Sequence, residues 1–144
     1  MVFGEKKNGE YNDREGVYFI PIVDNRVAVV KTPKGYFFIG GGIEDGETDE
    51  ACILRECLEE TGRSARVGKF VGSAETYTEH PVLGLFHPIQ RYYLGELLEA
   101  VDTPKEEDHE LVWVEYGNLK GKMFAEMQNW ALEEGIKNAT DYTN

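Results

Sequence analysis

Cationic side chains are scarce in this sequence. Its 144 residues include 15 Lys and Arg against 27 Asp and Glu, which gives a net charge of −12. The cations form no basic run, and an acidic protein repels a phosphate backbone, so we exclude nucleic acid polymers as partners. A small anionic substrate remains compatible with this charge if a local cation, such as a bound metal ion, receives it.

Long apolar runs are also missing. The opening MVFGEKKNGEY is polar and lacks the apolar stretch of a secretory signal, and no later run approaches the length of a membrane span. We therefore expect a cytoplasmic protein without a membrane partner. Cysteine is rare as well. Cys52 and Cys57 point in different directions from one predicted helix, so we interpret them as ordinary thiols of a reducing compartment.

The size of the chain suits one domain, which we place at residues 1–144. The 41% hydrophobic content is enough for one packed core, and there are no internal repeats or low-complexity linkers. Apolar and amphipathic patterns predict strands at 17–23, 26–31, 36–39, 66–77, 89–98 and 111–116 and helices at 48–61 and 123–136. This irregular alternation indicates an α/β fold, in which helices pack on the faces of a mixed sheet.

Local signals mark several boundaries. Asp24-Asn25 is typical of a hairpin turn, and three glycines at 40–42 free the backbone for a tight approach. Thr48 is a suitable N-cap for the first helix, and Gly62 is a suitable stop. Residues 80–88 are too irregular to assign, and we expect the polar tail after residue 136 to fray.

Three glutamates on the first predicted helix are the main chemical signal. Glu56, Glu59 and Glu60 project from one face within a turn of each other, and such like charges destabilise a helix by about a few tenths of a kcal/mol per pair. A divalent cation would remove this penalty, and clustered carboxylates suit Mg²⁺ or Mn²⁺. The alternative interpretation is a solvated acidic face. We expect the opposite face to pack on the core through Ala51, Leu54, Leu58 and Thr61.

The glutamates belong to a longer pattern. It reads Gly41-x5-Glu47-x7-Arg55-Glu56-Cys57-x-Glu59-Glu60-x-Gly62-Arg63. From the residue frequencies, its chance occurrence in such a chain is on the order of 10⁻⁵. The sequence here resembles the Nudix hydrolase family, whose defining box has this arrangement. The resemblance implies the Nudix fold, an α/β/α sandwich with a mixed β-sheet and a catalytic loop-helix-loop.

The resemblance also implies roles for single residues. Glu56, Glu59 and Glu60 would hold Mg²⁺, or Mn²⁺ in its place, with the backbone carbonyl of Gly40 as a further ligand. Glu56 would also accept a proton from the attacking water.

Residues outside the three glutamates would support the metal site or add a ligand to it. Arg55 would reach back to Glu47 and tie the glycine loop to the helix, although an incidental surface ion pair is the alternative. Many family members add a carboxylate from a distant loop, and we select Glu107 from the acidic run at 106–110, which is otherwise a solvated loop. We assign no histidine to metal; only His109 lies beside that acidic run.

The resemblance leaves the substrate open. The short chain is similar to MutT-type enzymes, which implies a small-molecule nucleotide substrate: a nucleoside triphosphate, oxidised forms included, cleaved to monophosphate and pyrophosphate. Hydrolysis of ADP-ribose, sugar nucleotides or dinucleoside polyphosphates is an alternative, and a non-catalytic nucleotide-binding regulatory domain is another. Tyr77, Phe86 or Tyr92 would be available to stack on a base, although aromatic residues in strands more often belong to the core. The sequence does not distinguish a monomer from a homodimer.

Overall fold

The computed structural model describes residues 1–143, with side chains described through residue 139. The elements are β1 (Val2–Phe3), β2 (Asn12–Val23), β3 (Arg26–Thr32), β4 (Gly35–Phe37), β5 (Ile39–Gly42), α1 (Asp49–Thr61), β6 (Arg63–Thr76), β7 (Thr78–His80), β8 (Gly84–Ala100), β9 (Glu110–Glu115), α2 (Tyr116–Leu119) and α3 (Glu126–Thr143). Both predicted helices and most of the predicted strands are therefore present. The strand predicted at 36–39 is divided between β4 and β5, and β5 continues through the glycines at 40–42, where the strand was expected to end. Strands β1 and β7 and the short helix α2 were not predicted.

The strands of the described chain form one mixed sheet. Their order is β1-β6-β8-β2-β3-β4, with β5 paired to β2, β7 to β8 and β9 to β3. Strand β2 is central in the sheet. It pairs in parallel with β8 and, after a turn, antiparallel with β3. Asp24 and Asn25 in that turn have φ angles of 49° and 63°, the left-handed conformation of a two-residue hairpin turn. The predicted hairpin is confirmed.

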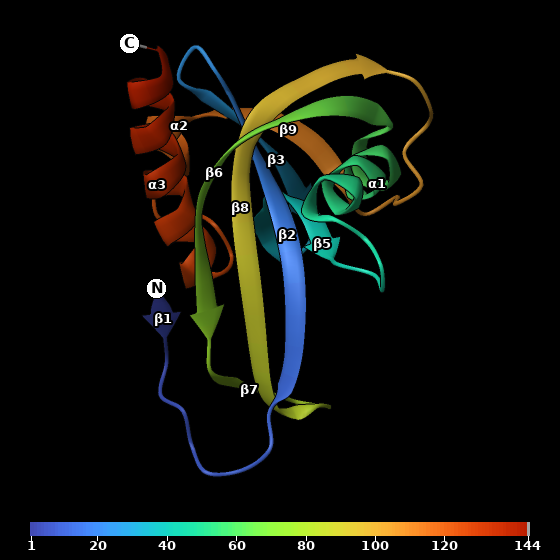
Figure 1. Ribbon diagram of the computed structural model, residues 1–144. Helices are drawn as coiled ribbons and strands as arrows, with labels where there is room; N and C mark the ends of the chain where they lie inside the picture. The colour runs from blue at the N-terminus through green and yellow to red at the C-terminus, as the bar shows by residue number, and fades with distance from the viewer. Residues whose placement is uncertain (144) are drawn as a thin grey trace.

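Helices cover both faces of the sheet. Helix α1 lies on one face, and α2 and α3 lie on the other (Figure 1). Because successive side chains of a strand point to opposite faces, β2 contributes to two cores. Val17 and Phe19 pack toward α1, and Ile20 packs toward α3. The predicted α/β/α sandwich with a mixed sheet is confirmed.

The prediction for the buried face of α1 was wrong. We expected Ala51, Leu54, Leu58 and Thr61 on the core. The buried residues of α1 are Cys52, Ile53, Cys57, Glu60 and Thr61, so only Thr61 was placed correctly. Ala51 is exposed, Leu58 is only partly buried, and Leu54 is 37% exposed. The carboxylate-bearing face is therefore next to the buried face rather than opposite it, and this brings Glu60 under the edge of the sheet.

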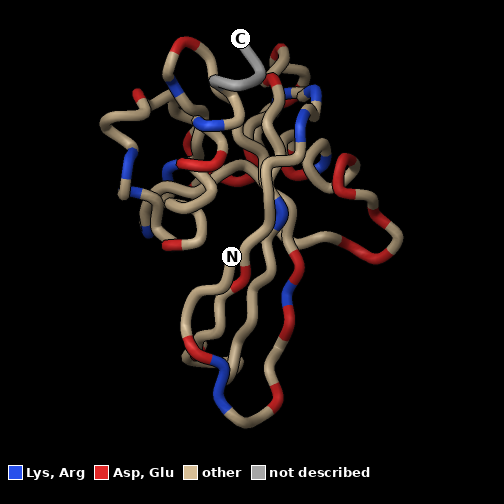
Figure 2. The backbone as a smooth tube through the Cα atoms, turned by 60° about the vertical axis from the view of Figure 1, so that its left-hand side comes forward, with Lys and Arg blue, Asp and Glu red and all other residues tan. Residues whose placement is uncertain are grey.

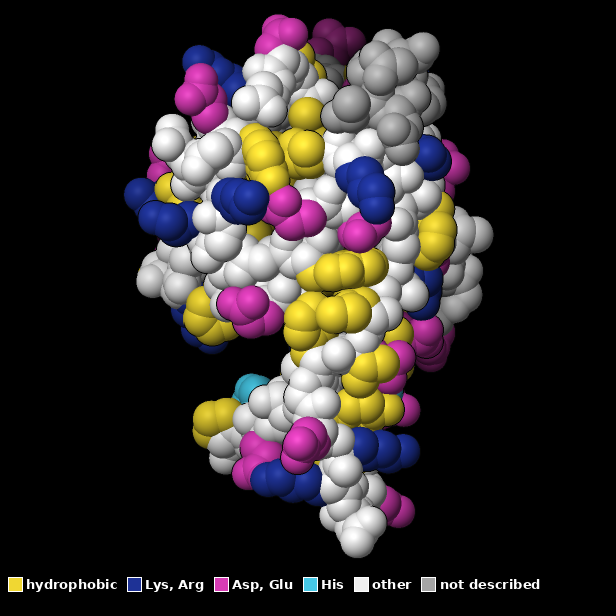
Figure 3. Space-filling model, turned by 90° about the vertical axis from the view of Figure 1, so that its left-hand side faces the viewer, with side chains coloured by type: hydrophobic (Ala, Val, Ile, Leu, Met, Phe, Trp, Pro, Cys, Tyr) yellow, Lys and Arg dark blue, Asp and Glu magenta, His cyan; other side chains and the backbone are white. Residues whose placement is uncertain are grey.

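Residues 80–88, which the sequence left unassigned, lie at the tip of a β-arm. Strand β7 turns back into β8 there, with His80 opposite Gly84. The arm projects from the body of the molecule as a narrow extension (Figures 2 and 3). Its tip carries Val82, which is 85% exposed.

Helix α3 differs from its predicted bounds at both ends. It begins at Glu126, because Met123 pairs with Tyr36 and the Phe124 amide donates to the Tyr36 carbonyl. It continues to Thr143 where a frayed tail was expected, since Ile136 and Ala139 still pack on the core. Asn144, the last residue of that tail, lies outside the described residues. None of the helices in the described chain is long and apolar enough to span a membrane.

Candidate active site

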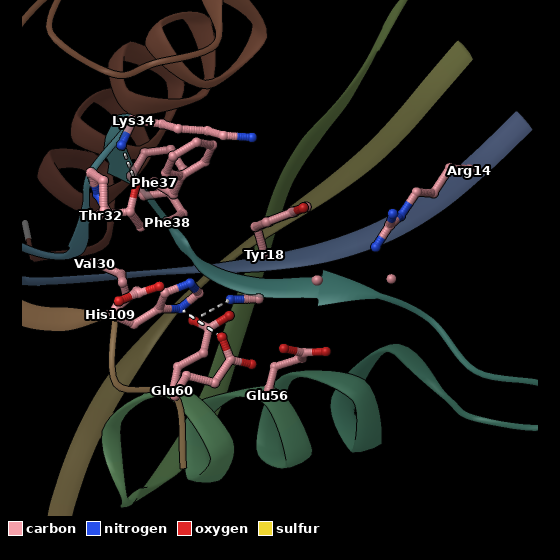
Figure 4. Close-up of a pocket in the computed structure, with 16 residues that line it drawn as sticks. Arg14, Tyr18, Val30, Thr32, Lys34, Phe37, Phe38, Glu56, Glu60 and His109 are labelled. Atoms are coloured by element: carbon pink, nitrogen blue, oxygen red, sulfur yellow. Dashed lines mark hydrogen bonds and ion pairs between the residues drawn. The ribbon is translucent and has the colours of Figure 1, made fainter. Parts of the chain in front are cut away.

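A cavity of about 520 Å³ opens along the free edge of β5. In the described chain, β5 pairs with β2 alone, so its other edge is not covered by a strand. Glu56 and Glu60 rise from α1 on one side of β5, and Tyr18 and Arg14 reach the cavity from β2 on the other (Figure 4). The cavity is therefore anionic on the α1 side.

Three carboxylates from two segments meet beside this wall, and two of them, Glu56 and Glu106, line the cavity. Glu56 and Glu59 of α1 and Glu106 of the loop before β9 each offer an oxygen, and these oxygens lie within 4.8 Å of one another. All three side chains are partly buried, which weakens the screening of their mutual repulsion by water. The arrangement fits a hard divalent cation, because Mg²⁺ and Mn²⁺ prefer carboxylate oxygens.

Glu60 lies deeper in the same wall. Its residue is 5% exposed, and its Oε2 accepts the Gly40 amide at 3.4 Å. Burial, followed by the charge of Glu56, raises the pKa of Glu60 well above its usual range. Burial also raises the pKa of Glu56, although Arg55 opposes that shift. The two neighbouring carboxylates are therefore held in an environment that disfavours two negative charges.

The glycine run at 40–42, which forms the end of β5, lies against Glu56. A Cβ atom on Gly41 would lie 2.7 Å from Glu56 Oε1, closer than such atoms approach in proteins. Glycine at position 41 is thus required for the carboxylate to stand against the backbone of β5. This is the close approach that the glycine run predicted.

Arg55 connects the helix to the loop on its N-terminal side. Its Nε and Nη2 contact the two oxygens of Glu47 at 2.6 and 3.0 Å, and Nη2 also donates to the Gly42 carbonyl at 3.0 Å. The bidentate pair with Arg55 lowers the pKa of Glu47 to about 2. The contact expected between Arg55 and Glu47 is present, and it fixes the glycine loop to α1.

Arg55 also reduces the repulsion among the glutamates. Its Nη1 lies 2.8 Å from Glu56 Oε1 and 3.5 Å from Glu59 Oε2. The helix therefore supplies part of the screening that the sequence analysis attributed to a metal ion. One guanidinium lies within 3.7 Å of carboxylate oxygens of four glutamates, at positions 44, 47, 56 and 59, so an excess of negative charge remains.

The distant carboxylate in the cluster is Glu106, whereas Glu107 was the predicted residue. The Lys105 amide donates to the Glu59 carbonyl at 2.9 Å, and the Asp102 amide donates to the Gly62 carbonyl at 3.0 Å. These bonds dock the loop on the C-terminal end of α1 and bring Glu106 beside Glu59. Glu107 is exposed and is not part of the cavity wall in the described structure. No signal in the acidic run separates the two residues.

His109 lies on the cavity wall next to Glu106. Its Nδ1 is 3.0 Å from Glu106 Oε2, although the angles are not those of a hydrogen bond. Within the described chain, the group of candidate metal ligands consists of carboxylates.

The aromatic residues of the cavity are not those suggested by the sequence. Tyr92 is buried in the core, Tyr77 stacks on His87 with 4.2 Å between ring centroids, and Phe86 contacts His80. Tyr18 and Phe37 line the cavity instead. Burial and the charge of Glu60 raise the pKa of Tyr18 to about 12, so its hydroxyl remains protonated at neutral pH.

Comparison with known proteins assigns this arrangement to a family. The family model described as NUDIX domain matches residues 13–133, which include the sheet apart from β1 and the first residue of β2, the glycines at 40–42, α1 and the Glu106 loop. The chain belongs to the Nudix family. None of the curated proteins matches the chain.

Solved structures, two of them of NUDIX hydrolases, share the fold. A NUDIX hydrolase from Nitrosomonas europaea has a TM-score of 0.71 at 18% identity, and the match covers 89% of this chain and 90% of that one. A MutT NUDIX hydrolase from Burkholderia pseudomallei has a TM-score of 0.71 at 22% identity, with 85% and 98% covered. The E. coli ORF135 protein has a TM-score of 0.68 at 21% identity, with 88% and 91% covered.

The Nudix hydrolase assignment agrees with the chemistry of the cavity. Nudix hydrolases are pyrophosphohydrolases that act on small-molecule nucleotides and generally use a divalent metal, and the carboxylate cluster of this chain has the donor atoms for such an ion. The residues that sequence reasoning missed are Glu106, Tyr18, Arg14 and Lys34, which come from loops and strands outside the Nudix box.

Proposed function

We propose that this Nudix hydrolase cleaves nucleoside triphosphates in a Mg²⁺-dependent reaction that yields the monophosphate and pyrophosphate. The observation that carries the proposal is the cluster of Glu56, Glu59 and Glu106, two of which, Glu56 and Glu106, line a cavity that also has an aromatic end at Phe37. A triphosphate needs a site for its charge and a surface for its base, and the cavity offers both.

The carboxylates at the cavity are the candidate metal ligands. Glu56, Glu59 and Glu106 would hold Mg²⁺, with Glu60 and the Gly40 carbonyl beside them as further candidate ligands. When bound, the ion neutralises charge on the phosphate oxygens and orients the water for in-line attack.

The other residues act on orientation and proton transfer. Arg55 holds Glu56 through its 2.8 Å contact, and Glu47 holds Arg55 in turn. Glu56 is thereby fixed at the cavity, where we assign it as acceptor of the proton from the attacking water. We assign to Glu106 the role that was predicted for Glu107. Glu106 and Asp108 of this loop both line the cavity, and Glu106 is the one that lies with Glu56 and Glu59.

The test is pyrophosphate and phosphate release with Mg²⁺ against nucleoside triphosphates, 8-oxo-dGTP, ADP-ribose, sugar nucleotides and diadenosine polyphosphates. We expect metal-dependent turnover of a triphosphate that falls by about 100-fold or more in Glu59→Gln, a loss typical of removing one group that stabilises transition-state charge. Glu50→Gln is the matched control, since Glu50 is exposed on the same helix.

The alternatives give different results in the same assay. Turnover of ADP-ribose, a sugar nucleotide or a dinucleoside polyphosphate in preference to every triphosphate would replace the proposed substrate. A protein that binds nucleotides yet turns over none of the panel would be a non-catalytic binding domain.

A further inference from the structure

Two cations line the cavity at opposite ends. In the part of the chain that the structure describes, Arg14 and Lys34 are the Lys and Arg side chains of the cavity wall. Figure 4 shows Lys34 beside Phe37 at one end and Arg14 at the other, with Glu56 and Glu60 along the wall between them. A bound molecule that touches both cations must therefore pass the carboxylate cluster.

Among the described residues Arg14 has no carboxylate partner, although it lies between two acidic residues in the sequence. Asp13 contacts His87 at 2.8 Å, and Glu15 contacts Arg91 at 2.8 Å. No ion pair or side-chain hydrogen bond of Arg14 is present among the described residues, and its side chain is exposed. In a chain with a net charge of −12, a cation left unpaired at the mouth of a cavity is available to an anionic ligand.

The guanidinium of Arg14 lies against the glycine loop. A Cβ atom on Gly42 would be 3.4 Å from Arg14 Nε and Nη2, the distance at which ordinary van der Waals contact begins. The guanidinium therefore lies next to the backbone of Gly42 at the end of β5. An arginine fork in this place can donate two parallel hydrogen bonds to one phosphate group.

The surface beyond Arg14 is acidic. Arg14 also lines a neighbouring hollow of about 660 Å³, whose other charged residues are Asp13, Glu15, Glu44, Asp45 and Glu47. Anions are repelled from such a surface, so a phosphate chain that enters the cavity has a favourable contact at Arg14 and an unfavourable environment beyond it.

The opposite end suits a nucleoside. Phe37 packs on Phe124, with 5.1 Å between ring centroids, and Phe124 is 58% exposed. Stacking of a base on an aromatic ring contributes about 1–3 kcal/mol and tolerates different bases. The two ends of the cavity therefore differ in chemistry, with aromatic surface at one and a guanidinium at the other.

We propose that Arg14 binds the terminal phosphate of the substrate and selects mononucleoside triphosphates over both diphosphates and dinucleoside polyphosphates. The proposal rests on the proposed function for the identity of the reaction. A diphosphate has one phosphate fewer than a triphosphate to extend from a base at Phe37 toward Arg14, so we expect it to make the weaker contact. A dinucleoside polyphosphate has to extend its second nucleoside and the adjoining phosphates past Arg14 over the acidic hollow.

The experiment compares wild type, Arg14→Ala and the control Arg26→Ala, since Arg26 is an exposed arginine on the neighbouring strand outside the cavity. kcat and KM are measured with a nucleoside triphosphate, its diphosphate and diadenosine tetraphosphate. Loss of a hydrogen-bonded charge should raise KM for the triphosphate by about 10- to 100-fold in Arg14→Ala. KM for the diphosphate should change by less than about twofold, and Arg26→Ala should match wild type.

Binding of α,β-methylene triphosphate and diphosphate analogues, measured by calorimetry with Mg²⁺, separates this proposal from the proposed function. Selective loss of triphosphate binding in Arg14→Ala supports the role of Arg14 even if the wild type turns over nothing. Equal losses for triphosphate and diphosphate, or a wild-type preference for diadenosine tetraphosphate, would overturn it while leaving the hydrolase intact. A wild type that binds neither analogue overturns it as well.

Discussion

The two helices that cover the sheet are held in place by different forces. Helix α3 buries Met127, Ala131 and Leu132 in an apolar core. Helix α1 buries two thiols, one isoleucine, Thr61 and the carboxyl of Glu60, and it is tied down by the contacts of Arg55 and Asp49. Apolar burial is favourable wherever it occurs, whereas burial of a carboxylate costs free energy unless it is paired.

The difference bears on which side of the sheet carries the proposed chemistry. The α3 side is mainly apolar, and its buried polar residue, Gln128, is hydrogen-bonded to the Phe38 amide and to Gln90. The α1 side retains like charges whose mutual repulsion Arg55 offsets only in part. We infer that α3 mainly stabilises the fold, whereas the clustered carboxylates of α1 lower its stability and form a reactive surface. Substitutions on the two helices should therefore separate stability from activity.

The largest effect on folding is expected from Leu132→Ala in α3. Leu132 is fully buried, so the substitution should lower the free energy of unfolding by about 2–5 kcal/mol. Leu54→Ala in α1 removes the same atoms from a side chain that is 37% exposed and should cost less than about 1 kcal/mol. Urea denaturation of both variants tests this difference, and equal losses would contradict the account.

An effect of intermediate size is expected from Glu106→Gln. Removal of one charge from the cluster should lower kcat/KM by about 10- to 100-fold, equivalent to about 1.4–2.7 kcal/mol of activation free energy. Glu107→Gln should change it by less than about twofold, because Glu107 is exposed and outside the cavity wall. Steady-state kinetics at saturating Mg²⁺ measures both, and a larger loss in Glu107→Gln would restore the original prediction.

The smallest effect concerns the start of α1. Asp49 accepts hydrogen bonds from Arg91 Nε and Nη2, both at 2.9 Å, and from the Tyr93 hydroxyl. Arg91, supported by Tyr93, holds the pKa of Asp49 below its usual value. Asp49→Asn should therefore lower stability by about 1–2 kcal/mol at pH 7.

The pH dependence of this effect follows from the direction of the shift. A depressed folded pKa contributes stability above the unfolded value of about 3.9, and that stability is lost as the pH falls through the folded pKa. The gap between wild type and Asp49→Asn should thus be full at pH 7 and shrink as the pH falls below about 4. Chemical denaturation across this range tests it, with the exposed neighbour Glu50→Gln as control; a constant gap would show that the charge of Asp49 is not the cause.

Local features of the fold were predictable from the sequence. The Asp24-Asn25 hairpin, the Thr48 cap and the Gly62 stop depend on neighbouring residues, and all three are present. The glycine run also predicted a close approach to the backbone, and Gly41 makes this approach to Glu56.

Features that depend on long-range contacts were not predictable. The choice of Glu106 over Glu107 follows from the bond between the Lys105 amide and the Glu59 carbonyl, which joins segments far apart in the sequence. The buried face of α1 was assigned wrongly because a carboxylate, Glu60, belongs to it, and an apolar pattern gives no sign of a charge that turns inward. Arg14 lies outside the Nudix box, and its place at the cavity depends on the pairing of β2 with β5.

The most direct test of the account is the stabilisation of the folded protein by Mg²⁺ in wild type, Glu56→Gln and Glu50→Gln, measured by thermal unfolding over a Mg²⁺ titration. A ligand that binds only the folded state adds about 2.7 kcal/mol at 100 times its Kd. We predict a saturable rise in Tm for wild type and Glu50→Gln and a rise that is largely lost in Glu56→Gln. Equal responses of all three proteins would contradict the claim that the carboxylates of α1 form a metal site.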